Sequence, residues 1–294
     1  MSVTAPPPFD RIITNPDDRR AAVVEIIRGA RRTLGLSLFR CNDKDIFAEL
    51  RRAVERGVAV EVLVTSRAKG GKKKLKKLWD SLEATGADVR PYTDPVVKYH
   101  AKYVIADDGP ALVSSLNFTK KCFNRTIDAM AVTADPSVVA GLRDLMKADR
   151  DSRPIPDNVP PRLIVGPERA RKQITALVEQ ARSRIQIIDA KLTDPGMVSL
   201  LNARRQAGIA VDVFGAKHYG EWRSHGKLML IDGKIAIVGS LALAALSLDF
   251  RREVAMVVDE PSAIAEIDAL FRFVATAAAN DDDVTADRAG GRAC

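Results

Sequence analysis

Cysteine, histidine and aromatic residues are all scarce in this sequence of 294 residues. The three cysteines, Cys41, Cys122 and Cys294, lie far apart, so they form neither a cluster of zinc ligands nor a disulfide framework. A reducing compartment is therefore expected. Aromatic residues make up 5% of the chain, which gives few surfaces for stacking nucleic-acid bases.

Long apolar runs and targeting segments are missing as well. No stretch approaches the roughly 18 uninterrupted apolar residues of a membrane-spanning helix. The first residues lack the basic and apolar regions of a signal peptide, and Cys294, as the last residue, is not followed by the rest of a prenylation box. We therefore expect a cytoplasmic protein, one that can still act at the inner membrane surface as a peripheral protein.

Positive charge is in excess, because 46 Lys and Arg against 38 Asp and Glu give a net charge of +8. The excess favours an anionic partner: phospholipid head groups, nucleic acid or a phosphorylated metabolite. A basic surface that serves only solubility is the alternative. With 46% hydrophobic residues the chain can bury a core, and its length suits two domains of about 130 to 150 residues.

The two halves of the chain resemble each other without a gap over about 50 residues. Arg11 aligns with Arg162 and Gly57 with Gly208, both at an offset of 151 positions. Each copy predicts an amphipathic helix, a short apolar strand, a second helix and, after the glycine, a β-branched strand. Strands that alternate with helices indicate βαβ units and a largely parallel sheet. The predicted ranges are strands 34–39 and 185–188, and second helices 45–56 and 197–206.

A proline-rich segment separates the two copies. Residues 151–163 contain four prolines, which predicts a stiff linker, and the polar residues from 280 onward predict a flexible tail. The predicted domains are an N-terminal lobe (1–150), a linker (151–161), a C-terminal lobe (162–279) and the tail (280–294).

The first copy contains an insertion of 26 residues, because the offset between the copies falls from 151 to 125. The insertion (67–92) has six lysines within residues 69–77, followed by leucines and Trp79 at helical spacing. Three interpretations remain open. The segment is a helix on a membrane surface, a contact with nucleic-acid phosphates, or a solvated helix that packs through its leucines.

Two of the three histidines lie in one repeated motif, His-x-Lys-x4-Asp. The motif occurs once in each half, and a Ser-Ser or Gly-Ser pair follows the aspartate in both. Chance explains such a double match poorly. The residues are His100, Lys102, Asp107 and Ser115 in the first half, and His225, Lys227, Asp232 and Ser240 in the second.

Paired histidines and lysines suit the cleavage of a phosphodiester. A histidine and the lysine two positions later project from the same face of a strand. One neutral imidazole attacks phosphorus to form a phosphohistidine, and the other protonates the leaving oxygen and then activates water or an alcohol. The lysines neutralise the non-bridging oxygens, where a metal would otherwise be needed. A duplicated fold would bring the two motifs together across a shared cleft.

The paired pattern resembles the phospholipase D superfamily in its one-chain, two-motif form, and within it bacterial cardiolipin synthase-like and phospholipase D-like proteins. The resemblance implies an α/β fold, a tandem duplication of two phospholipase D-like lobes. Each lobe would be a mixed sheet flanked by helices, with the active site at the pseudo-twofold interface. The implied chemistry is ping-pong through a phosphohistidine, with no metal and no other cofactor.

The same resemblance implies a role for individual residues. His100 and His225 would be the nucleophile and the general acid/base, and we favour His100 as the nucleophile. The other implied roles are phosphate binding by Lys102, Lys227, Ser115, Asn117 and Ser240, orientation of a histidine by Asp128 and Glu253, and fixing of a turn or strand end by Asp107 and Asp232.

Three positions depart from the family pattern. Ser114 replaces the usual Gly, Ala242 replaces an Asn, and Asp128 replaces the longer Glu. Loss of one oxyanion donor lowers a rate by about a hundredfold, so reduced or narrower activity is expected. Before the second motif, His218 would either contact the substrate or be an ordinary surface residue. Trp222 would either line the rim of the site or pack its loop.

Three functions remain open at this point. We favour a phospholipase D or phosphatidyltransferase of the cardiolipin synthase kind, with an anionic phospholipid or membrane surface as partner. A nuclease of the same superfamily, acting on DNA or RNA, is supported by the net charge. A non-catalytic binder of phosphorylated ligands is suggested by Ser114 and Ala242. Because one chain contains both half-sites, a monomer is expected.

Overall fold

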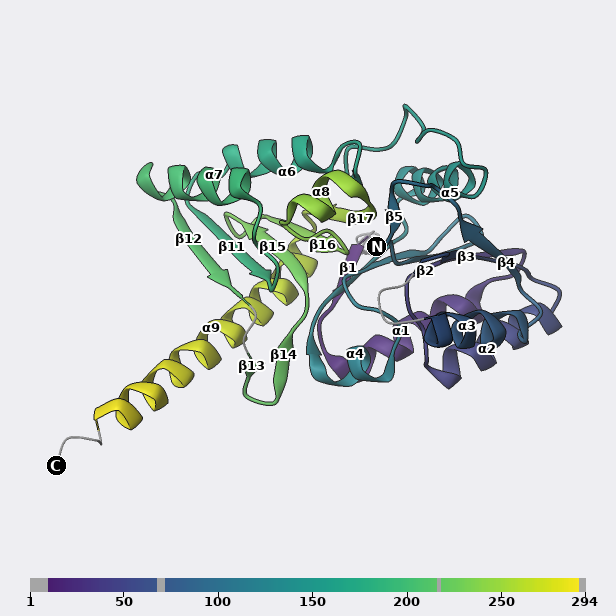
Figure 1. The fold of residues 1–294 in the computed structure, drawn as a ribbon, viewed down its shortest axis with the longest axis horizontal. Helices are drawn as coiled ribbons and strands as arrows, with labels where there is room; N and C mark the ends of the chain where they lie inside the picture. The colour runs from purple at the N-terminus through teal and green to yellow at the C-terminus, as the bar shows by residue number, and fades with distance from the viewer. Residues whose placement is uncertain (1–9, 68–71, 216–217, 291–294) are drawn as a thin grey trace, which may run out of the picture.

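The computed structural model describes residues 10–67, 72–215 and 218–290, with side chains as far as residue 280. Within these residues, most strands gather into two large sheets, one built mainly from each half of the chain (Figure 1). Helices cover both sheets. The predicted α/β class, with a mixed sheet and flanking helices in each lobe, is confirmed.

The first sheet has the strand order β1-β9-β7-β6-β2-β3-β4. Strands β2, β3 and β4 are parallel, whereas the pairs from β2 through β6, β7 and β9 to β1 are antiparallel. The prediction of a largely parallel sheet is therefore wrong, because a tight turn at 107–110 joins β6 to β7 and forces them antiparallel. The bounds are Asp10–Ile13 (β1), Thr33–Leu38 (β2), Ala59–Thr65 (β3), Asp88–Tyr92 (β4), Tyr103–Ala106 (β6), Ala111–Ser114 (β7) and Met130–Thr133 (β9).

Helices α1, α2 and α3 pack on one face of this sheet, and α5 packs on the other. Local sequence signals start these helices. In α1, the Asn15 side chain accepts a hydrogen bond from the Asp17 N–H, and Pro16 occupies the first helical position. The bounds are Pro16–Gly29 (α1), Lys44–Glu55 (α2), Lys72–Glu83 (α3), Lys120–Arg125 (α4) and Pro136–Arg150 (α5).

The insertion forms helix α3 and strand β4, which extends the first sheet beyond β3. Leu78 and Leu82 are buried and Trp79 is half-buried against the same core, so the helix packs through its apolar face. The lysines within α3 are exposed. Packing through the leucines is confirmed; membrane or nucleic-acid binding stays a prediction, and Lys69 lies outside the described residues.

The second sheet has the order β10-β17-β16-β15-β11-β12 and repeats the plan of the first without an equivalent of β4. Helices α6 and α7 pack on its outer face and α9 on its inner face. The bounds are Leu163–Gly166 (β10), Ala170–Glu179 (α6), Arg184–Asp189 (β11), Pro195–Gln206 (α7), Ala210–Phe214 (β12), Lys227–Ile231 (β15), Ile235–Gly239 (β16), Ala245–Phe250 (α8), Arg251–Val258 (β17) and Pro261–Gly290 (α9).

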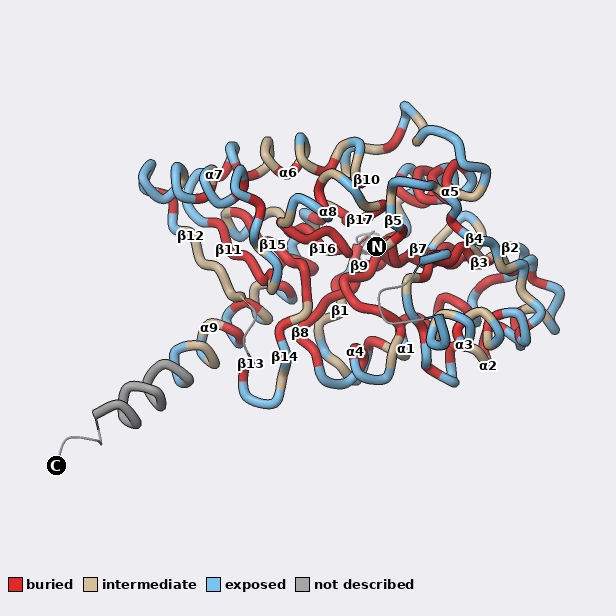
Figure 2. Tube along the Cα trace, in the orientation of Figure 1, coloured by how far each residue is buried: buried red, intermediate tan, exposed pale blue. Residues whose placement is uncertain are grey.

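The two lobes interlock through strand pairs and a shared core. Strand β5 (Lys98–Tyr99) of the first half pairs with β17 of the second. Strand β8 (Thr126–Ile127) pairs with β14 (Trp222–Ser224), which also pairs with β13 (His218–Tyr219). One apolar cluster contains residues of α5 and residues of β15, β17 and α9, and Figure 2 shows buried chain running through this junction.

The predicted flexible tail begins within a helix. Helix α9 continues to Gly290, and the flexibility of residues 280–290 stays a prediction. Alanines precede this segment and no proline interrupts it, so nothing stops the helix before the final glycines. In the described residues, no helix is both long and apolar enough to cross a membrane.

Candidate active site

Both motifs lie where a short cross-lobe strand leads into a core strand. His100 and Lys102 lie between β5 and β6, and His225 lies between β14 and β15. The prediction that His and Lys alternate within one strand is therefore wrong. Instead, each lysine turns back on its histidine: the Lys102 Nζ donates to the His100 carbonyl (2.5 Å), and the Lys227 Nζ donates to the His225 carbonyl (2.7 Å). Both lysines are buried.

Each motif histidine is held by a carboxylate from the opposite lobe. The His100 Nδ1 lies 2.8 Å from the Glu253 Oε2. The His225 Nδ1 lies 3.0 and 3.1 Å from the two carboxylate oxygens of Asp128. Both carboxylates are fully buried. A carboxylate on Nδ1 fixes the ring and leaves Nε2 as the nitrogen available for chemistry.

The strand pairs between lobes explain this exchange. In the β5–β17 pair, the His100 N–H donates to the Arg252 carbonyl (2.9 Å), one residue before Glu253. In the β14–β8 pair, the Gly226 N–H donates to the Ile127 carbonyl (2.7 Å), one residue before Asp128. Two equivalent parallel pairs therefore set two equivalent His–carboxylate contacts.

Buried hydroxyls hold the carboxylates in turn. Ser115 and Thr126 each donate to one oxygen of Asp128 at 2.6 Å. Ser247 donates to Glu253 at 2.8 Å. The Ser240 hydroxyl accepts from the Val254 N–H (3.1 Å), beside Glu253. Ser115 and Ser240 are both fully buried, the first bonded to Asp128 and the second to the backbone beside Glu253, and phosphate binding by them stays a prediction.

Asn117 is the remaining neutral candidate for binding phosphate. It is 8% exposed, and its Oδ1 has no hydrogen-bond partner among the described residues. The equivalent position in the second lobe is Ala242, whose backbone N–H donates to the Ser247 hydroxyl (2.9 Å). Ser114, the other departure from the family pattern, is buried and bonds locally to Leu116.

Asp107 and Asp232 directly follow β6 and β15, the core strands after the two motif histidines. They therefore lie at the ends of these strands that are far from the histidines. Asp107 accepts hydrogen bonds from the N–H groups of residues 31–33, and Asp232 accepts from those of residues 182–184. Both have positive φ angles, 44° and 54°. Their role is therefore to fix the turn after each motif strand and the start of the neighbouring strand, as the sequence suggested.

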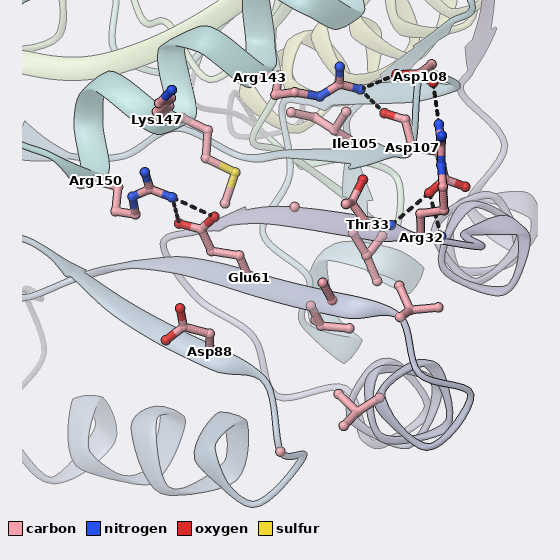
Figure 3. Close-up of a pocket in the computed structure, with 18 residues that line it drawn as sticks. Arg32, Thr33, Glu61, Asp88, Ile105, Asp107, Asp108, Arg143, Lys147 and Arg150 are labelled. Carbon is pink, nitrogen blue, oxygen red and sulfur yellow. Dashed lines mark hydrogen bonds and ion pairs between the residues drawn. The ribbon is translucent and has the colours of Figure 1, made fainter.

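A cavity of about 840 Å³ opens at this far end of the first lobe, between the first sheet and α5 (Figure 3). Its charged rim includes Arg143 beside Asp108, and Arg150 beside Glu61. Asp107 also lines it, whereas none of the motif histidines and lysines does. The cavity is thus separate from the candidate active site.

The two predicted rim residues lie on the hairpin that precedes the second motif. His218 is exposed on β13, and Trp222 is half-buried against the shared core. Among the described contacts, no hydrogen bond joins either side chain to a motif residue. Trp222 thus packs against the core and His218 lies on the surface, and contact of either residue with a substrate stays a prediction.

Burial and neighbouring charges shift the pKa values of the side chains at the site. Burial, reinforced by Lys102 and Lys227 and opposed by Glu253, lowers the pKa of His100 to about 3. Burial also lowers the pKa of Lys102 to about 7, with Lys227 adding to the shift and Glu253 opposing it. Burial disfavours the Glu253 carboxylate, but its contact with His100 and the charge of Lys102 prevail and lower its pKa to about 2. At neutral pH, His100 is therefore neutral and Glu253 ionised.

Sequence reasoning missed several residues around the histidines. The Phe39 ring lies 4.5 Å from the His100 ring between centroids. Burial and the nearby charges of Lys227 and Arg251 lower the pKa of Lys191. The repeat contained a signal for Lys191, since it aligns with the basic Arg40 at the offset of 151. No such signal marked Phe39, which aligns with an alanine.

A family model described as cardiolipin synthase, PLD-like domain matches residues 23–150 and 173–274, which is more than half of the chain. The chain belongs to this family. The suspected relation to the phospholipase D superfamily, in its cardiolipin synthase-like branch, is confirmed.

Curated relatives match part of this family member. Cardiolipin synthase A of Pseudomonas aeruginosa (strain UCBPP-PA14) is 30% identical over 127 residues, or 43% of this chain and 26% of the relative. The protein of the same name from Pseudomonas entomophila is 30% identical over 109 residues, or 37% and 23% of the two chains. The matched part thus spans about a quarter of the length of these relatives.

Two solved structures share the fold across both lobes. Polyphosphate kinase from Porphyromonas gingivalis gives a TM-score of 0.72 at 20% identity, covering 89% of this chain and 49% of that one. Phosphatidylserine synthase from Haemophilus influenzae gives 0.69 at 11% identity, covering 90% and 86%. At these identities the likeness establishes the fold alone.

Proposed function

We propose that the protein hydrolyses or exchanges phosphodiester bonds of phospholipids through a covalent phosphohistidine, without a metal. The observation that carries the proposal is the pair of motif histidines, each held at Nδ1 by a carboxylate of the opposite lobe. The curated relatives, which are cardiolipin synthases by name, support a phospholipid as the substrate.

In the first step, the Nε2 of His100 attacks phosphorus while the bond from phosphorus to the leaving oxygen breaks. The imidazolium of His225 gives its proton to that oxygen, so the alcohol leaves neutral. Lys102 and Lys227 neutralise the non-bridging oxygens as charge builds on them. In the second step, His225 takes a proton from water or an alcohol, whose oxygen attacks phosphorus and releases His100.

The surroundings of the two histidines support this division of roles. Burial and the two lysines lower the pKa of His100, which keeps its imidazole neutral and nucleophilic. The His225 side chain is more exposed than that of His100, 30% against 12%. An exposed ring exchanges protons with solvent between the two steps, which suits a general acid and base.

The test is phosphodiester turnover in EDTA, with phosphatidylglycerol vesicles and plasmid DNA assayed in parallel. The matched pair of variants is His225→Ala and His218→Ala, because His218 is the one histidine outside the motifs. We expect lipid turnover that survives EDTA, falls by roughly 10²- to 10⁴-fold in His225→Ala and is unchanged in His218→Ala.

A nuclease is the second candidate function. Exposed lysines of α3 (Lys72, Lys73, Lys74 and Lys77) favour a polyanionic ligand, and the net charge is +8. Cleavage of DNA but not lipid, with the same loss in His225→Ala, would replace the phospholipid proposal by this one. If the wild-type protein turned over neither substrate, both would be wrong.

We also propose an oligomeric state and a cellular location. One chain supplies both histidines and both carboxylates, so a monomer suffices for activity. We propose a cytoplasmic enzyme that works at the inner membrane surface, which light scattering and fractionation of cells would test.

A further inference from the structure

Helices α4 and α8 occupy equivalent places in the two lobes but expose different chemistry. Both follow the motif hairpin of their lobe, and the offset of 125 pairs Lys121 with Leu246 and Arg125 with Phe250. All four side chains are exposed, Leu246 by 43% and Phe250 by 51%. Positions that carry cations on α4 thus carry large apolar side chains on α8. Burying these side chains against something outside the chain would remove apolar surface from water.

A third exposed apolar residue, Val96, precedes the strand that pairs with β17. Leu246 and Phe250 are four positions apart, so they share one face of α8. Phe250 directly precedes β17, and Val96, 68% exposed, lies two residues before β5. Because β5 and β17 pair in parallel with Lys98 opposite Arg251, Val96 lies two residues before one strand of the pair and Phe250 lies one residue before the other. We call Val96, Leu246 and Phe250 the apolar patch.

The loop that carries Val96 is held in place. The Asp94 side chain accepts from the N–H groups of Val96 and Val97, at 2.8 and 2.7 Å. Arg67 donates to the carbonyls of Asp94 and Pro95. The exposure of Val96 is therefore a feature of an ordered loop.

The apolar patch adjoins the candidate active site. Strand β5 leads from the patch to His100 within four residues, and β17 leads from Phe250 to Glu253 within three. Figure 1 shows α8, β17 and β5 as neighbours. A surface that rested on the patch would therefore lie within a few residues, along both strands, of His100 and Glu253.

Cations adjoin the apolar patch: Lys98 and Arg251 follow its residues in the chain, and Lys191 lies near Arg251. Lys98 and Lys191 are exposed and Arg251 is half-buried, and among the described residues none of the three forms an ion pair with a carboxylate. Asp249, the acidic residue of α8, is paired with Arg171. Apolar side chains flanked by unpaired cations are complementary to a bilayer, whose phosphates lie above its acyl chains.

We propose that the apolar patch inserts into the surface of an anionic phospholipid bilayer while Lys98, Lys191 and Arg251 contact its phosphates. This inference rests on the proposed function for its purpose, because docking would deliver a lipid phosphodiester to His100. Only the apolar patch inserts, and the rest of the protein surface stays in contact with water.

The decisive variant is Leu246→Lys with Phe250→Arg, which gives α8 the two cations that α4 has at the equivalent positions. It removes the apolar side chains but adds two positive charges, so it separates insertion from simple charge attraction. The matched control is Phe273→Asp, since Phe273 is 47% exposed on α9, beyond the opposite end of β17. Circular dichroism checks that both variants fold.

The measurement is sedimentation with vesicles of phosphatidylglycerol and phosphatidylcholine, at low salt and at 0.5 M salt, where surface charges are screened to within about 5 Å. All proteins also carry His225→Ala, so that turnover plays no part. At high salt we expect the double variant to bind at least tenfold more weakly than its parent, and Phe273→Asp to bind equally well. Equal or tighter binding of the double variant at high salt would overturn the proposal.

Failure of the proposed function gives a different result. If the wild-type protein turned over no lipid while vesicle binding still depended on Leu246 and Phe250, the docking surface would stand and the enzymatic proposal would fall. If lipid turnover were confirmed but the double variant bound vesicles normally at high salt, the reverse would hold.

Discussion

Glu253 and Asp128 reach across the interface between the lobes to histidines in the opposite half of the sequence. A carboxylate on Nδ1 fixes the imidazole and stabilises the imidazolium form, while Nε2 does the chemistry. The local motif alone is therefore not sufficient to orient either histidine. Each half-site depends on the other lobe being docked correctly.

Replacing Glu253 by Gln tests this dependence. The amide keeps the shape but cannot stabilise charge on the His100 ring, so we expect kcat to fall by about 10²-fold or more with little change in KM. Steady-state kinetics on the proposed phospholipid measure both constants. Asp107→Asn is the control, since Asp107 is a carboxylate at the far end of the motif strand. An equal loss in both variants would mean that the Glu253 effect is structural.

The pKa of Lys102 predicts a pH dependence. Burial lowers it to about 7, so the free protein loses the Lys102 charge as pH rises through that value, whereas His100, with a pKa near 3, stays neutral. We expect kcat/KM to fall about tenfold per pH unit above 7. The Lys102→Arg variant, whose guanidinium stays charged, should lack this decline between pH 7 and 9. The same decline in the variant would assign it to another group.

The sequence predicted the motif residues but not all of their contacts. Spacing within one lobe revealed His100, Lys102 and their repeats. Whether Glu253 meets His100 or His225 depends on the pairing of β5 with β17, which joins residues more than 150 positions apart. The hydroxyl of Ser115 likewise turned toward Asp128, because a buried carboxylate requires donors.

At the scale of elements, the repeat predicted the helices and strands well and the direction of the strands poorly. Helical spacing and capping residues such as Asn15 are local, so the sequence shows them. Strand direction follows from how neighbours connect. The turn at 107–110 makes β6 and β7 an antiparallel pair where the alternation of helices and strands suggested parallel ones.

The turn at 107–110 should contribute to the stability of the fold through Asp107. The Asp107 carboxylate accepts three backbone N–H groups, at 2.7, 2.8 and 2.8 Å. Asp107→Ala leaves these donors to water, so we expect a loss of about 2 kcal/mol in the free energy of unfolding. Thermal unfolding should show a decrease in Tm of about 3 °C. Full activity per folded molecule should remain; its loss would give Asp107 a role in the site.

At the scale of the whole molecule, the lobes share one apolar cluster and a buried ion pair. Asp149 of α5 accepts from Arg252 of β17 at 2.8 Å, and both side chains are buried. Arg252 also bonds to Glu168. We therefore expect both lobes to unfold in one cooperative transition.

Arg252→Met tests the coupling between the lobes. The substitution leaves Asp149 buried without its partner, which costs about 3 to 5 kcal/mol in the free energy of unfolding. Burial already raises the pKa of Asp149 to about 7, above its value in the unfolded chain. Without Arg252 that pKa rises further, so ionisation opposes folding more as pH increases. The loss should therefore be larger at pH 8 than at pH 5.

The double variant Arg252→Met with Asp149→Leu isolates the unpaired carboxylate from lost packing. Removing both charges should recover much of the stability and abolish the extra loss at pH 8, because no buried acid remains to ionise at that position. Calorimetry of the single and double variants at the two pH values makes the comparison. Two separate transitions, with only one shifted by Arg252→Met, would show that the lobes fold independently. In that case, the cross-lobe contacts at His100 and His225 would form only after each lobe had folded.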